Sequence, residues 1–179
     1  MFKNLKRPML YYYGAKHDKL ILLKGYKSMD IIYHSNYTKV EHPKIIITKD
    51  FGKGFYCSMS KEQAEKEANK YINKIVNVYS LEDISDLKIK VFEEYNSEWL
   101  DFVVNCRSGN TNDYDIVEGF KTDDTILDII EEYVNGHIDK EKLLEMMESN
   151  WSDRQISFNT LRALNRIKFI RFYNTQEIV

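Results

Sequence analysis

The stretch Asp50-Phe51-Gly52-Lys53-Gly54-Phe55-Tyr56-Cys57-Ser58 is the most informative part of this 179-residue chain. Its two glycines precede a short aromatic run that predicts a β-strand over 55–58. Ser60 follows, and Gln63 stands three residues later, which is the spacing of a capping box at the start of a helix. Glycine lets a backbone approach a planar ligand closely, and Tyr56 offers a ring face for stacking. The stretch therefore predicts the edge of a binding site, while the alternative, that its aromatic residues only fill a core, stays open.

Downstream of residue 28 the chain shows no linker, repeat or second boundary. A length of 179 residues suits one core better than two. Short β-branched or aromatic runs mix irregularly with helical patterns, which indicates an α+β fold rather than a doubly wound parallel sheet. We expect strands near 30–34, 44–48, 55–58, 76–79, 87–91, 114–117, 155–158 and 168–173. We expect helices capped by Ser60, Ser97 and Thr122 and one starting at Asp139, the first with a buried stripe that extends to Ile75.

Charge is distributed unevenly along the chain, although the net charge is only −2. Residues 1–28 carry seven Lys or Arg and one Asp, whereas residues 29–179 carry nineteen basic and twenty-seven acidic residues. Four tyrosines, at positions 11, 12, 13 and 26, lie among those lysines. This basic, aromatic N-terminal extension, residues 1–28, can fold back onto the acidic body or contact a nucleic acid or another acidic partner.

Composition excludes several classes of protein. Hydrophobic residues make up 43% and charged residues 30%, which are ordinary values for a globular domain. No apolar run approaches the roughly 20 residues that cross a bilayer, and no secretory signal is evident, so we expect a cytoplasmic protein. Cys57 and Cys106 lack the spacing of a zinc or redox motif. The acidic pairs at 123–124 and 131–132 are typical of solvated helix surfaces, and no metal site is predicted.

Two further segments carry residues suited to ligand recognition. His34, within Tyr33-His34-Ser35, ends the first predicted strand, where its ring can hydrogen-bond a sugar hydroxyl or a core acceptor. Gln155, within Gln155-Ile156-Ser157-Phe158, begins a late strand. A side chain at that position can reach the same cleft as His34 if the strands are neighbours.

In chain order, the segments around His34, Tyr56 and Gln155 resemble the His, Tyr and Glu/Gln motifs of the ADP-ribosyltransferase fold. Residues 30–170 also resemble a bacterial family of domains of unknown function usually grouped near those enzymes. The resemblance implies one domain over 29–179, with split mixed β-sheets flanked by helices and NAD bound as substrate in a cleft between them. It further implies transfer of ADP-ribose to a protein or nucleic acid acceptor, as in a toxin or effector that has a cognate antitoxin or immunity protein.

The resemblance also implies roles for individual residues. His34 would hold the adenosine ribose with Ser35 beside it, Gly54 and Tyr56 would approach the nicotinamide, and Lys53 would contact a phosphate. The catalytic residues would be His34, Tyr56 and Gln155. Many members of the resembled class have Gly where this chain has Ser35, which would keep the backbone further from the ligand.

Gln155 decides between two functions. Cleavage of the glycosidic bond of NAD builds positive charge on the ribose, which a Glu stabilises better than a neutral Gln. A Gln therefore implies either a slower transferase or a catalytically inactive module that binds NAD, a nucleotide or a partner. Trp151 and Asp153, just upstream, stand where the resembled enzymes recognise the acceptor.

Overall fold

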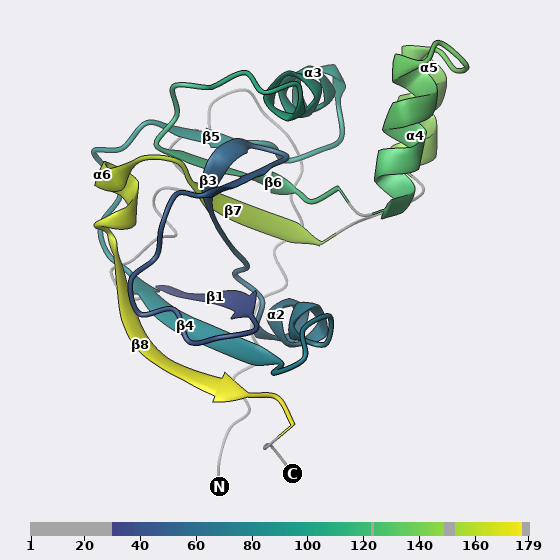
Figure 1. Ribbon diagram of the computed structural model, residues 1–179. Helices are drawn as coiled ribbons and strands as arrows, with labels where there is room; N and C mark the ends of the chain where they lie inside the picture. The colour runs from purple at the N-terminus through teal and green to yellow at the C-terminus, as the bar shows by residue number, and fades with distance from the viewer. Residues whose placement is uncertain (1–29, 123, 149–152, 177–179) are drawn as a thin grey trace, which may run out of the picture.

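Two β-sheets, one of three strands and one of five, form the body of this domain (Figure 1). The computed structural model describes residues 30–122, 124–148 and 153–176, and the predicted N-terminal extension 1–28 lies outside them. Within these ranges the chain forms eight strands and five helices. The predicted α+β class is therefore confirmed.

The three-stranded sheet has the order β1-β4-β8 and is antiparallel throughout. Its strands are β1 (Asp30–Asn36), β4 (Ile75–Leu81) and β8 (Ile167–Asn174). The five-stranded sheet has the order β2-β3-β7-β6-β5 and comprises β2 (Ile47–Lys49), β3 (Gly52–Cys57), β7 (Arg154–Phe158), β6 (Ile116–Phe120) and β5 (Ile89–Val91). It is a mixed sheet, because β5 and β6 pair in parallel while the other neighbours are antiparallel.

Alternation along β3 separates two hydrophobic cores. Phe55 and Cys57 point between the sheets, where they pack with residues of both, among them Ile32 of β1 and Ile156 of β7. Tyr56 points the opposite way, into the core beneath the helices. Burial of these apolar side chains is the main source of stability, and the alternation fixes which side of β3 each residue serves.

Helices α3 (Ser97–Arg107), α4 (Asp124–Val134) and α5 (Lys140–Glu148) cover this second core (Figure 1). Asn96, rather than the predicted Ser97, caps α3 by accepting a hydrogen bond from the Trp99 amide at 2.9 Å. The fully buried Trp99 then packs in the core at the start of the helix.

Helix α2 (Lys61–Ala68) begins as predicted, with the Ser60 hydroxyl accepting from the Gln63 amide at 3.2 Å. The predicted extension of its buried stripe to Ile75 is wrong. The helix ends at Ala68 with Asn69 as its C-cap, Ile72 is 93% exposed, and Ile75 belongs to β4. Pairing of β4 with strands on both sides outweighs the continued helical spacing of apolar residues.

The two sheets meet where β1 lies beside the end of β3. Tyr33 and Ser58 exchange two backbone hydrogen bonds of 2.8 Å there. The short helix α6 (Leu161–Leu164) links β7 to β8, so the chain passes from one sheet to the other. Among the helices of the described ranges, none has the length and apolarity to cross a membrane.

Candidate functional site

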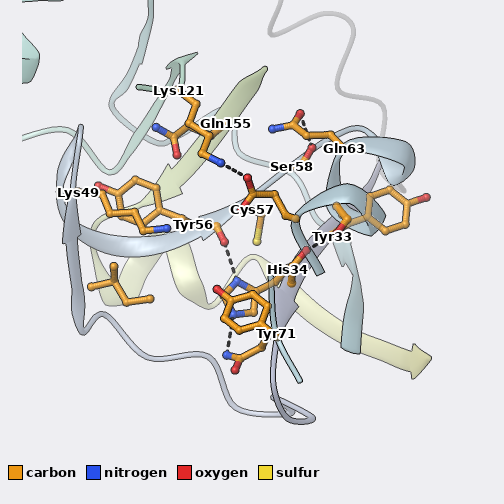
Figure 2. A pocket seen from close by; sticks show the side chains of 15 residues that line it. Tyr33, His34, Lys49, Tyr56, Cys57, Ser58, Gln63, Tyr71, Lys121 and Gln155 are labelled. Atoms are coloured by element: carbon orange, nitrogen blue, oxygen red, sulfur yellow. Dashed lines mark hydrogen bonds and ion pairs between the residues drawn. The ribbon is translucent and has the colours of Figure 1, made fainter. Parts of the chain in front are cut away.

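A pocket opens at the junction of the two sheets, between β1, β2, β3, β7 and α2 (Figure 2). Its lining includes four predicted site residues, His34, Ser35, Tyr56 and Gln155. The pocket holds about 80 Å³ of space. That is less than the roughly 300–1,000 Å³ of a site that encloses a drug-sized ligand, so a longer molecule has to extend across the surface beyond it.

His34 is held rigidly at the base of this pocket and is 7% exposed. Its Nδ1 lies 2.7 Å from the main-chain oxygen of Tyr56, and because a carbonyl can only accept, Nδ1 carries the proton. Burial, together with the nearby charge of Lys49, lowers the pKa of His34 to about 4. The ring is therefore neutral at pH 7, and Nε2 is a hydrogen-bond acceptor, here 3.1 Å from the amide nitrogen of Asn36.

Ser35 contributes structure as well as lining. Its hydroxyl donates to the carbonyl oxygen of Ala64 at 2.5 Å, which ties β1 to the middle of α2. The side chain is half-buried, and this bond uses the hydroxyl hydrogen of Ser35.

Tyr56 lines the pocket with a ring that is only 6% exposed. Its hydroxyl donates to the Gly52 carbonyl at 2.5 Å and accepts from the Phe51 amide at 3.1 Å. Phe51 lies parallel to the ring, with 6.5 Å between centroids, and the ammonium of Lys49 lies 5.6 Å from the ring centroid. Burial raises the pKa of the phenol. The ring thus forms a wall of the pocket, and its hydroxyl closes the turn before β3.

Gln155 reaches the pocket from the start of β7 and is bound to a buried carboxylate. Its Nε2 donates to Oδ2 of Asp50 at 2.6 Å. Both residues are buried, at 6% and 2% exposure. Among the described residues, none donates a hydrogen bond to Oε1 of Gln155.

Two lysines and one glutamate, Lys49, Lys121 and Glu67, line the pocket and leave it one excess positive charge. Lys49 ends β2, and Lys121 follows β6 and forms an ion pair with Glu67 of α2. The pocket wall crowds the ammonium of Lys49, and this desolvation, with the charge of Lys121, lowers its pKa. Burial opposes the ionisation of Glu67, but the hydrogen bond and charge of Lys121 outweigh it and lower the pKa of the carboxyl.

The remaining predicted site residues lie outside this lining. Lys53 is exposed on β3, and Gly54 faces Ser157 and Asn159. Asp153 is exposed just before β7, and Trp151 lies outside the described residues. Strand alternation already separates Lys53 from Tyr56, because residues three apart point to opposite faces.

A second pocket adjoins the first and shares Gln63 and Gln155 with it. It holds about 390 Å³, and the ion pair between Arg154 and the buried Glu118, with 3.0 Å between Nη2 and Oε1, lines it. A ligand anchored beside His34 can therefore continue past Gln155. Within the described ranges no three His, Cys, Asp or Glu side chains are grouped as a metal ion would require.

Sequence reasoning missed Lys49 and Asp50. Asp50 begins the segment singled out above and Lys49 precedes it, but their contributions depend on how the chain folds around β2 and β3. Lys49 lies opposite Gly52, so it shares the face of Gly54 and Tyr56. The partners of Asp50, namely Arg107, Thr122 and Gln155, are 57 to 105 residues away in the chain.

A family model described as "Protein of unknown function (DUF3990)" matches residues 30–169. This chain belongs to that family. The matched segment runs from the first residue of β1 into β8 and contains every residue that lines either pocket. No curated protein and no solved structure matched the chain.

Proposed function

We propose that the protein is an NAD-dependent ADP-ribosyltransferase that modifies a protein or nucleic acid in the cytoplasm. The observation that supports this proposal is that three residues far apart in the sequence line the same pocket. His34, Tyr56 and Gln155 are separated by 22 and 99 residues and come from three strands, yet they line one pocket. Their order is the one in which the resembled enzymes carry their His, Tyr and Glu/Gln motifs.

The polar groups of the pocket suit a nucleotide. Oε1 of Gln155 is an acceptor, and Nε2 of His34 can accept from a ligand in place of the Asn36 amide, while ribose hydroxyls are donors. Lys49 and Lys121 supply positive charge at the mouth, where a pyrophosphate would extend. Hydroxyl donors joined to an anionic group are the shared features of NAD and ADP-ribose.

The resemblance gives each of the three residues a role, and the geometry of the pocket is compatible with these roles. His34 would bind one ribose through Nε2, displacing the Asn36 amide. The wall formed by Tyr56 would bound the nicotinamide, and Gln155 would present Oε1 to the reacting ribose. As the glycosidic bond breaks, positive charge develops on that ribose, and a fixed carbonyl dipole stabilises it. The second pocket, which also contains Gln155, would admit the acceptor group.

A second candidate is a catalytically inactive module that binds NAD or another nucleotide. Two observations favour it: Gln155 carries no net charge, and the ring of Tyr56 is 6% exposed. The hydrogen-bond acceptors and the lysines of the pocket can bind a nucleotide whether or not the protein catalyses a reaction. Both candidates therefore predict nucleotide binding.

Calorimetric titration of the full-length chain with NAD, followed by measurement of nicotinamide release, tests both candidates. Binding with release supports the transferase, and binding without release, even when cell lysate supplies acceptors, supports the inactive module. His34→Ala should weaken binding at least about 10-fold, whereas the exposed control His42→Ala should not. If the wild type does not bind NAD, both candidates are wrong.

If the protein acts as a toxin, its expression should arrest growth, and His34→Ala should relieve the arrest while the protein stays folded. A cognate antitoxin or immunity protein would then be recovered as a suppressor. If growth arrest persists in His34→Ala, the toxicity does not depend on this pocket.

A further inference from the structure

Asp50 lies buried behind the pocket and is the most heavily hydrogen-bonded carboxylate near it. Oδ1 accepts from Nε and Nη2 of Arg107 at 2.9 and 2.5 Å and from the hydroxyl of Thr122 at 2.5 Å. Oδ2 accepts from the Thr122 amide at 2.9 Å and from Nε2 of Gln155 at 2.6 Å. Asp50 therefore ties the β2–β3 turn to the end of α3, the end of β6 and the start of β7.

This arrangement leaves Gln155 only one amide orientation. A carboxylate paired with a guanidinium accepts hydrogen bonds, so the group of Gln155 that faces Asp50 must be the NH₂. The opposite orientation would set two oxygens against each other in a buried position. Oε1 is consequently the atom that Gln155 turns away from Asp50, and Gln155 lines the pocket.

We propose that Asp50 is a positioning residue that fixes the amide of Gln155 so that Oε1, and not Nε2, meets the ligand. The proposal rests on the proposed function, because it assigns to Gln155 the binding of a hydroxyl donor of NAD. Asp50 itself does not touch the ligand; it acts through the amide.

The same geometry explains why this chain carries Gln rather than Glu at position 155. A carboxylate in place of the amide would lie at hydrogen-bond distance from Oδ2 of Asp50, and the two acceptors would repel unless they shared a proton. Gln155 and Asp50 thus form a matched donor–acceptor pair, and a charge can be introduced at 155 only if Asp50 changes as well.

The test compares Asp50→Asn with Asp115→Asn in the full-length chain. Asp115 is a matched control because it is also buried, at 8% exposure, and accepts from the Lys88 amide at 2.9 Å and the Thr160 hydroxyl at 2.6 Å, outside the pocket lining. An asparagine at position 50 can turn its own NH₂ toward Gln155 and reverse the amide. Asp50→Asn should then weaken NAD binding at least about 10-fold, while Asp115→Asn lowers only the melting temperature.

Rescue separates positioning from stability. In the double variant Asp50→Asn/Gln155→Glu, the new carboxylate can accept from the introduced amide, so NAD should bind at least about 10-fold more tightly than to either single variant. If instead the losses of the single variants simply add, or Asp50→Asn and Asp115→Asn reduce NAD affinity equally, Asp50 has only a structural role and the proposal is wrong.

A readout without ligand keeps this test distinct from the proposed function. The NMR signal of the Gln155 side-chain NH₂, assigned by its absence in Gln155→Met, should be protected from hydrogen exchange in the wild type and lose that protection in Asp50→Asn. If the wild type does not bind NAD, the proposed function fails and this signal alone decides the role of Asp50: unchanged protection refutes it.

If Asp50→Asn does not fold, Gln155→Glu and Gln155→Met decide the matter. Both remove the donor to Asp50, but only Glu adds a repelling charge. Gln155→Glu should lower the melting temperature more than Gln155→Met, and the difference should shrink as the pH falls and the two carboxyl groups come to share a proton. Equal and pH-independent melting temperatures would overturn the proposal.

Discussion

The imidazole of His34 donates through Nδ1 to the carbonyl oxygen of Tyr56 over 2.7 Å, and this bond joins the three-stranded sheet to the five-stranded sheet (Figure 2). It lies next to the backbone bonds between Tyr33 and Ser58. The first two residues of the candidate site are therefore fixed to each other before any ligand binds. Such preorganisation reduces the ordering that binding requires.

The neutral state of His34 makes stability depend on pH. Its pKa is about 4 in the folded chain against 6.5 in the unfolded chain, so between these values the unfolded state binds more protons. Stability should accordingly be lost as the pH falls from 6.5 to 4, by at most roughly 3 kcal/mol. Denaturant unfolding across this range measures the effect.

His34→Asn is the control for this titration, because its side-chain amide can keep the bond to the Tyr56 carbonyl but does not titrate. Subtracting its pH profile removes the contribution of the carboxylates. Wild type and His34→Asn profiles that run parallel between pH 4 and 6.5 would contradict the burial of a neutral histidine.

The sequence predicted the members of the site better than their surroundings. Short β-branched runs located the strands, and motif order brought His34, Tyr56 and Gln155 together. We assigned Lys53 to the site, although residues three apart on one strand point to opposite faces of the sheet. The sequence alone therefore indicated that Lys53 and Tyr56 lie on different faces of β3. The position of Lys49 depends on the register between β2 and β3, and the three-residue, glycine-containing pairing of 47–49 with 52–54 does not specify that register by itself.

Gly54 has a packing role that its predicted ligand contact did not anticipate. A Cβ at this position would lie 2.6 Å from Oδ1 of Asn159 and closer still to Oγ of Ser157. Gly54→Ala should therefore destabilise the fold by roughly 1–3 kcal/mol, because the two side chains must move. Unfolding by urea measures this, and adding Ser157→Ala should recover part of the loss. A stable Gly54→Ala with weaker NAD binding would instead support the ligand contact.

The hydroxyl of Tyr56 should matter for folding more than for binding. Tyr56→Phe removes the bond to Gly52 and leaves the Phe51 amide without its acceptor, at a cost of roughly 1–3 kcal/mol. The ring wall remains, so NAD affinity should change less than about twofold. Unfolding and titration of the same preparation measure both effects. A large loss of affinity without a loss of stability would mean that the hydroxyl contacts the ligand.

Lys49 and Lys53, four positions apart, allow a test of whether the phosphates of the ligand bind in the pocket or along the exposed face of β3. Lys49 lines the pocket, whereas Lys53 is exposed outside that lining. Methionine keeps most of the apolar stem and removes the charge. Lys49→Met should weaken binding of NAD and ADP-ribose about 10-fold and reduce its dependence on salt, because the charge that meets the phosphates is gone. Nicotinamide, which has no phosphate, should bind as before.

Lys53→Met is the matched control and should leave all three ligands unaffected. A second consequence follows from the effect of the Lys49 charge on His34: without that charge, the lowered pKa of His34 should rise, and an NMR titration of the ring detects the change. If Lys53→Met weakens NAD binding while Lys49→Met does not, the phosphates lie along the opposite face of β3, and the pocket at the sheet junction is not where the anionic part of the ligand binds.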